Sequence, residues 1–181
     1  FESLFAQCST LMTSIIRLPK PVIARVHGIA TAAGCQLVAS CDLAVASTDA
    51  HFATPGVNIG LFCSTPMVAV SRTVNRKQTM EMLLTGTPIS SERARELGLI
   101  NRVVEPKLLN AETHELARSI ASKSPLTVKI GKEAFYRQLE MDLDSAYALT
   151  SKAMTENMMA ADAREGIDAF MQKREPLWEG K

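Results

Sequence analysis

The sequence has 181 residues, of which 46% are hydrophobic and 22% charged, the proportions of a single globular domain with a substantial core. Its 20 Lys and Arg residues nearly balance its 19 Asp and Glu residues, so the net charge of +1 creates no overall field that attracts nucleic acid or an anionic membrane. No apolar run reaches the roughly 20 residues that a bilayer-spanning helix needs, which leaves small molecules and other proteins as the expected partners.

The first third of the chain is predicted to alternate short strands with helices. Residues 1–16 carry apolar side chains at helical spacing with no start signal before them, so we expect the domain to begin upstream of residue 1. Pro19 and Pro21 end this helix, because proline does not continue one. After them we expect a strand at 22–26, a segment of small and β-branched residues at 28–34 that permits close backbone approach, a helix at 35–40, strands at 42–47 and 51–53, and a loop at 58–64.

The remainder is predicted to be mostly helical. Ser90 is a good N-cap for a short helix to Leu97, and Gly98 provides the left-handed residue that stops it. We divide the domain into a core at 1–106 and a helical region at 107–181. The expected elements are helices at 65–74 and 77–84, the short helix after Ser90, a strand at 100–104, and helices at 107–122, 125–138, 143–159 and 162–174.

The helical region carries more apolar side chains than four isolated helices can bury. They include Met154, Met158, Met159, Phe170 and Trp178. Because a large apolar surface on a soluble protein usually marks a contact area, these helices are expected to assemble the protein into an oligomer.

The cysteines and histidines show neither disulfide nor metal-ligand spacing. Free thiols in a reducing compartment are expected, and no metal site is expected. The residues concerned are Cys8, Cys35, Cys41, Cys63, His27, His51 and His114.

Distinct motifs follow one another along the whole chain. In the first half they are Lys20-Pro-Val-Ile-Ala-x-Val-x-Gly28, Gly34-Cys35-x-Leu37, Cys41-Asp42-x-x-x-Ala46, Phe52-x-x-Pro55 and Gly60. In the second half they are Glu81-Met82-x-Leu84-Thr85-Gly86, Ile89-Ser90, Ala94-x-x-x-Gly98-Leu99 and Gly166-x-x-Ala169-Phe170-x-x-Lys173-Arg174. In this order and spacing they resemble the enoyl-CoA hydratase/isomerase (crotonase) family, and Gly60-Leu-Phe-Cys-Ser-Thr65 is most similar to one subgroup of it.

The resemblance implies a fold and a chemistry. The implied fold is an α/β crotonase-type spiral of β-β-α turns with C-terminal helices that assemble trimers, or hexamers as dimers of trimers. The implied chemistry is stabilisation of a thioester enolate by two backbone N–H groups, one of which falls on Ala33. The second donor is expected upstream of residue 1. The implied ligand is an acyl-CoA thioester, with coenzyme A as part of the substrate and no separate cofactor.

Two positions depart from the family pattern. The glutamates with which the family's hydratases add water align with Gln36 and Gly56. Hydration needs one group to take a proton and another to supply one, and neither residue can do so near neutral pH. We therefore expect no ordinary hydratase activity. Two interpretations of Gln36 remain open: it holds a water or a polar thioester atom, or it is a neutral residue of the pocket wall.

Further residues are implied as the acyl-CoA pocket. Asp42 lies near them but is interpreted as a turn or cap residue. Cys63 could be a nucleophile, although no base is identifiable and inert lining is preferred. A helical Phe is more often core and a Lys more often solvated, so only the resemblance links Phe170 and Lys173 to the adenine and phosphates of CoA. The implied substrate-binding residues are Ile29, Thr31, Pro55, Leu61, Cys63, Phe170 and Lys173.

Two functional classes therefore stay open. The first is an acyl-CoA enzyme whose reaction needs only enolate stabilisation, and the second is a non-catalytic acyl-CoA-binding or regulatory protein. The expected compartment is the cytoplasm for a bacterial source and the mitochondrial matrix for a eukaryotic one.

Overall fold

The computed structural model describes residues 1–181, which form two compact units. Unit 1 comprises residues Phe1–Ile16 and Val22–Leu116, and unit 2 comprises Arg17–Pro21 and Ala117–Lys181. Unit 1 contains all the strands, whereas unit 2 is helical.

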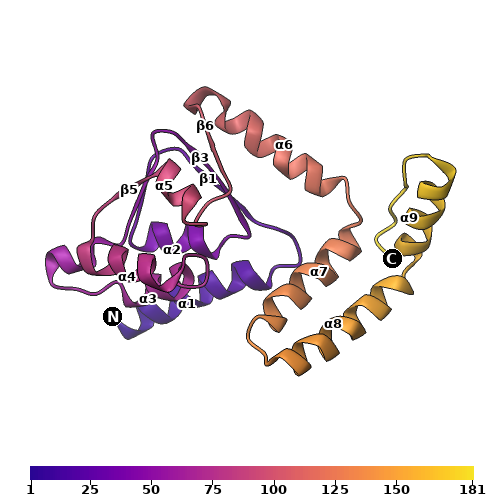
Figure 1. The fold of residues 1–181 in the computed structure, drawn as a ribbon, viewed down its shortest axis with the longest axis horizontal. Helices are drawn as coiled ribbons and strands as arrows, with labels where there is room; N and C mark the ends of the chain where they lie inside the picture. The colour runs from indigo at the N-terminus through magenta and orange to yellow at the C-terminus, as the bar shows by residue number, and fades with distance from the viewer. The chain divides into compact units, whose positions relative to one another are not determined.

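The strands of unit 1 form two small sheets. The first has the order β1 (Ile23–Val26), β3 (Leu43–Ser47), β6 (Arg102–Val104), with all neighbours parallel. The second has the order β2 (Ile29–Thr31), β4 (His51–Ala53), β5 (Ile89–Ser90), in which β2 and β4 are parallel and β4 and β5 antiparallel. The chain thus places one strand in each sheet per turn, and Figure 1 shows β1, β3 and β6 side by side. Because a central parallel strand is covered on both faces, Ala44, Val45 and Ala46 of β3 are all buried, and Ser47 is buried with them.

Short helices complete each turn of this spiral. They are α1 (Glu2–Arg17), α2 (Ala33–Ser40), the 3₁₀ turn η1 (Pro55–Ile59), α3 (Ser64–Val70), α4 (Arg76–Thr85), α5 (Ser91–Glu96) and the 3₁₀ turn η2 (Pro106–Leu108). The buried faces of α2, α3, α4 and α5 meet the strands in one core that includes Val26, Ala30, Phe52, Val70 and Met82. Deleting such a buried side chain typically costs several kcal/mol, so this core fixes the geometry of the turns around it.

Local capping explains where the helices of unit 1 begin and end. The side chain of Asn75 accepts a hydrogen bond from Gln78 N at 3.2 Å, and Ser90 Oγ accepts one from Arg93 N at 3.2 Å. Gly98 has a φ of +84°, the left-handed conformation expected for the residue that stops α5. The predicted cap and stop of this short helix are confirmed.

Unit 2 is built from three helices and the end of a fourth. These are α7 (Pro125–Gln138), α8 (Leu143–Met158) and α9 (Ala161–Gln172), the orange to yellow helices of Figure 1, and the last residues of α6 (Leu109–Ala121). The side chains of Ser124 and Asp142 cap α7 and α8 by accepting from the amides of Thr127 and Ser145. Pro125 at the first position of α7 has no N–H to satisfy.

Several predicted boundaries were wrong. Residues 29–31, expected only as a close-approach segment, form β2, because pairing with β4 supplies backbone hydrogen bonds that the local sequence does not indicate. The helix expected at 65–74 runs from Ser64 to Val70, and the first two residues of the loop expected at 58–64 belong to the 3₁₀ turn η1. The strand expected from residue 100 begins at Arg102, because Ile100 is packed in the core before pairing starts.

Candidate functional site

The turn from β2 into α2 holds a strained backbone. Ala32 has φ 49° and ψ −114°, a conformation that L-residues rarely adopt, and its N–H donates to Ala53 O at 3.0 Å. Gln36 N donates to Ala32 O at 3.0 Å, which starts the helical hydrogen bonds. The amide of Ala33 is the first of α2 and has no acceptor within the helix. The turn therefore presents a backbone donor next to the end of β4.

Gln36 is buried, with 4% of its surface exposed. Its Oε1 accepts a hydrogen bond from Cys8 Sγ in α1 at 3.6 Å, and its carbonyl accepts from Ser40 Oγ at 2.8 Å. An amide neither gains nor loses a proton near neutral pH. The side chain at this position is thus a neutral group that already has a thiol partner.

Gly56 lies in a loop that closes tightly around it. Its N–H donates to Cys63 Sγ at 3.3 Å, and its carbonyl accepts from Leu61 N at 2.9 Å. A Cβ at this position would lie 2.8 Å from Leu61 O and 3.0 Å from Cys63 Sγ, closer than real Cβ contacts. The side chains of Leu61 and Phe62 are exposed, so the backbone of Leu61 and the thiol of Cys63 fill the space that a side chain at residue 56 needs.

A second thiol faces the same region. Burial, followed by the proximity of Cys63, raises the pKa of the Cys35 thiol to about 12, while a backbone hydrogen bond from Ala53 opposes the rise. Cys35 is therefore protonated at neutral pH and is neither a thiolate nucleophile nor a base. Thr54, which follows β4, is fully buried, and its Oγ1 has no hydrogen-bond partner.

The structure brings some of the predicted site residues together and leaves others apart. The β2–β4 pairing and the Cys35–Cys63 interaction bring positions 33–36 close to 53–63. A surface groove of about 430 Å³ in unit 1 is lined by Ile29, Gly34 and neighbouring residues of β1 and α2, but not by Gln36, Gly56 or Cys63. Ile29, Thr31 and Leu61 are exposed and Pro55 is half-buried, so the residues implied for substrate binding do not enclose one cavity in this chain.

Phe170 and Lys173 belong to unit 2. Phe170 lies near the end of α9 with 81% of its surface exposed, and Lys173 follows that helix with φ 54° and ψ 42°. Arg174, next in the chain, is paired with Glu165 at 2.6 Å. An exposed aromatic ring and a cation therefore stand at one helix end.

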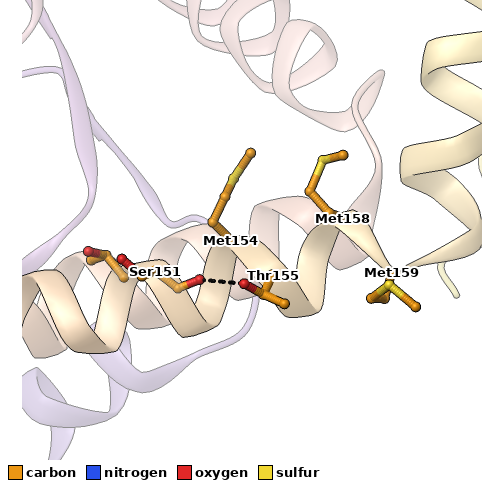
Figure 2. A pocket seen from close by; sticks show the side chains of 6 residues that line it. Ser151, Met154, Thr155, Met158 and Met159 are labelled. Carbon is orange, nitrogen blue, oxygen red and sulfur yellow. Dashed lines mark hydrogen bonds between the residues drawn. The ribbon is translucent and has the colours of Figure 1, made fainter.

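A groove of about 530 Å³ runs along α8 (Figure 2). Thr155 Oγ1 donates to Ser151 O at 2.9 Å along its floor, and the side chains of Met154, Met158 and Met159 are exposed around it. The exposed methionines are among those expected to form contacts between subunits.

The remaining residues considered in the sequence are Asp42 and the cysteines. Asp42 Oδ2 accepts from Val22 N at 2.6 Å, which fits the structural role predicted for it. All four cysteines are free, and no group of three His, Cys, Asp or Glu side chains is placed to hold a metal ion. No helix is both long enough and apolar enough to cross a membrane.

Three residues near this site were not predicted from the sequence: Cys8, Ala32 and Thr54. Cys8 meets Gln36 through a side-chain contact between α1 and α2 that no local pattern in the sequence indicates. The run of small residues at 28–34 could have indicated the strained turn at Ala32, because close backbone approach often needs unusual dihedral angles.

The match to known proteins covers nearly the whole of this chain. The family model described as enoyl-CoA hydratase/isomerase matches residues 3–181. The chain belongs to the enoyl-CoA hydratase/isomerase family. The crotonase fold predicted from the motifs is confirmed by solved structures of the family.

Individual relatives identify the subgroup that Gly60–Thr65 indicated. The chain is 55% and 56% identical over 174 residues to mouse and human enoyl-CoA hydratase domain-containing protein 3, mitochondrial, covering 96% of the chain and 58% and 57% of those proteins. It is 37% identical over 160 residues to a short-chain-enoyl-CoA hydratase of Clostridium acetobutylicum, covering 87% of the chain and 60% of that protein. This enoyl-CoA hydratase/isomerase family chain thus spans less than two thirds of the length of these relatives.

Two solved structures are similar to this chain in both sequence and backbone. An enoyl-CoA hydratase of Mycobacterium smegmatis superposes with a TM-score of 0.96 at 57% identity, covering 98% of the chain and 69% of that structure. Human enoyl-CoA hydratase domain-containing protein 3 superposes with a TM-score of 0.94 at 57% identity, covering 96% and 69%. At this identity the likeness extends beyond fold to the subgroup predicted from the sequence.

Proposed function

We propose that the protein binds an acyl-CoA thioester and stabilises the enolate of that thioester with the Ala33 amide. The observation that carries the proposal is the β2–α2 turn, where the strained Ala32 presents an amide with no acceptor within α2. Backbone donors aimed at developing negative charge are among the strongest catalytic devices, and they cost little reorganisation because the fold fixes them.

The groups around this donor favour a reaction other than ordinary hydration. Gln36 is neutral and bonded to Cys8, Gly56 has no side chain, and the raised pKa of Cys35 keeps its thiol protonated. Adding water across a double bond requires a base and an acid with pKa values near the working pH. We therefore propose an acyl-CoA enzyme whose reaction depends on carbonyl polarisation, with coenzyme A as part of the substrate and no separate cofactor.

A second candidate is a non-catalytic acyl-CoA-binding or regulatory protein. It is favoured by the tight loop at Gly56, in which the Leu61 carbonyl and the Cys63 thiol occupy the space of a catalytic side chain. The Leu61 carbonyl must move before a carboxylate side chain fits at residue 56.

We also propose how the protein assembles and where in the cell it is located. Homotrimers or hexamers are proposed, with the exposed apolar faces of residues 107–181, including the groove along α8, covered by neighbouring copies. In such an assembly Phe170 and Lys173 would serve the nucleotide part of CoA in a neighbouring pocket, as the family resemblance implies. The proposed location is the mitochondrial matrix in a eukaryote, in line with relatives named as mitochondrial, and the cytoplasm in a bacterium.

Calorimetry and turnover of the full-length protein test these proposals. Acyl-CoA should give a binding heat and a thermal shift, because a ligand selective for the folded state stabilises it. No heat at saturating acyl-CoA would refute both candidate functions. Loss of the enoyl absorbance of crotonyl-CoA should be negligible for the natural sequence, and robust hydration that persists in Gln36→Ala would show that another group transfers the protons.

Turnover of other acyl-CoA thioesters separates the two candidates. The enzyme proposal predicts faster exchange of the α-proton of a saturated acyl-CoA with deuterated solvent: solvent water takes the proton, and the Ala33 amide stabilises the enolate that remains. Binding without any such exchange or product would favour the regulatory alternative.

A further inference from the structure

The side chain of Gln36 lies at the same end of α2 as the Ala33 amide. Ala33 is the first residue of this helix and Gln36 follows it by three positions, so both lie on one helical face. Helical side chains tilt toward the N-terminus of their helix, which directs the Gln36 carboxamide back to the turn that carries the Ala33 N–H. A backbone donor and a side-chain amide are therefore available together at this helix end.

The thiol of Cys8 determines which end of that carboxamide is left for a ligand. Cys8 Sγ donates to Gln36 Oε1 at 3.6 Å, which uses the acceptor end of the amide. Gln36 Nε2 donates to no residue, although only 4% of the Gln36 surface is exposed. Unlike Thr54 Oγ1, which is unpartnered and sealed, Nε2 is not fully enclosed. Because an unpaired donor in such a place is costly, position 36 is suited to bind an oxygen of a ligand.

The remaining groups of the site set a condition on that ligand. Gly56 has no side chain, and burial raises the pKa of the Cys35 thiol to about 12, so neither removes a proton near neutral pH. A 3-oxoacyl thioester needs no strong base, because its α-carbon lies between two carbonyl groups. The negative charge of its enolate is shared by two oxygens, which matches the two donors at the start of α2.

We propose that the protein binds 3-oxoacyl-CoA thioesters as the enolate, with the thioester oxygen accepting from the Ala33 amide and the 3-oxo oxygen accepting from Gln36 Nε2. This inference rests on the proposed acyl-CoA function and names its substrate class. The α-C–H bond breaks, solvent water takes the proton, and the electron pair is shared between the two oxygens, so the step needs no other reactant. Gln36 is a substrate-binding residue, and Cys8, which acts through Gln36, is a positioning residue.

Calorimetry with acetoacetyl-CoA and butyryl-CoA tests this on the full-length protein, because the two thioesters differ only in the 3-oxo group. The wild type should bind acetoacetyl-CoA at least about tenfold more tightly, the size of one charge-assisted hydrogen bond. The absorbance band of the acetoacetyl-CoA enolate should rise on binding at pH 7. The matched control is Gln7→Met, which removes an exposed amide of α1 bonded to Ser3 and should change neither result.

Variants of Gln36 and Cys8 test the two residues separately. Gln36→Met keeps the length of the side chain without a donor and should abolish both the preference and the enolate band. Gln36→Glu offers acceptors only and places a negative charge beside the enolate, so it should abolish both as well. Cys8→Ala releases Gln36 Oε1 and should remove part of the preference, whereas Cys8→Ser keeps a donor and should retain it.

Equal affinity of the wild type for the two thioesters would overturn this inference, as would a preference that survives in Gln36→Met. If Gln36→Met does not fold, Gln36→Glu decides the same question, because a retained enolate band there excludes a donor role for residue 36. Equal preferences in Cys8→Ala and Cys8→Ser would refute the positioning role of Cys8. A wild type that binds neither thioester would instead refute the proposed acyl-CoA function itself.

Discussion

Replacing Gly56 with alanine adds a single methyl group where the loop has no room for it. The new Cβ would lie 2.8 Å from Leu61 O and 3.0 Å from Cys63 Sγ, and the first of these atoms belongs to the backbone and cannot rotate away. Overpacking of this kind typically costs about 1–3 kcal/mol. For a protein of this size, about 2 kcal/mol corresponds to a fall in Tm of about 4–8 °C.

The matched control is Gly28→Ala. No atom lies within 4 Å of a Cβ at Gly28, and its φ is not in the left-handed region, so the change should be neutral or slightly stabilising. Thermal unfolding of both variants measures the difference. Adding Cys63→Ala to Gly56→Ala should relieve part of the strain, because one of the two close contacts disappears while the Leu61 carbonyl remains.

Equal Tm values for Gly56→Ala and Gly28→Ala would refute this reasoning about the loop. The same contacts bear on catalysis, because a glutamate at residue 56 must first displace the Leu61 carbonyl. Introducing Gln36→Glu and Gly56→Glu together should therefore restore crotonyl-CoA hydration only to a small fraction of a true hydratase, and either change alone should restore almost none.

Three further outcomes are expected. Asp162 and Glu165 of α9 hold residues 173–181 by hydrogen bonds, and their pKa values are lowered in the folded protein. The stability that these carboxylates contribute is therefore complete above about pH 4.5 and is lost as the pH falls toward 2. The fluorescence emission of Trp178, the only tryptophan, should change in that range and stay constant between pH 5 and 7. Ala32→Gly should raise the free energy of unfolding by about 1 kcal/mol, because glycine adopts a positive φ without strain; an unchanged Tm would contradict the strain. Met154→Lys should reduce the mass measured by light scattering if the α8 groove is a subunit contact, and an unchanged mass would exclude that face.

Local signals in the sequence determined much of the secondary structure. Pro125 and Ser124 mark the start of α7, and Ser90 and Gly98 bound α5, because caps, stops and helical spacing act within a few residues of the chain. The ordered motifs were sufficient for the family, whose fold and subgroup the comparisons confirm. The prediction that Gln36 and Gly56 stand where the family's hydratases carry glutamates also comes from the sequence alone.

Contacts between distant segments decided the rest. β2 exists because residues 29–31 pair with β4, and Gln36 meets Cys8 because α1 lies on α2; neither contact leaves a local pattern. The sequence shows that residue 56 is a glycine, but only the folded loop shows that the Leu61 carbonyl and the Cys63 thiol occupy its side-chain space. In the same way, Lys173 and Arg174 are adjacent cations in the sequence, and only the fold shows that Arg174 is paired with Glu165. Side-chain identity sets which chemistry is available, whereas packing across long sequence separations sets which groups meet.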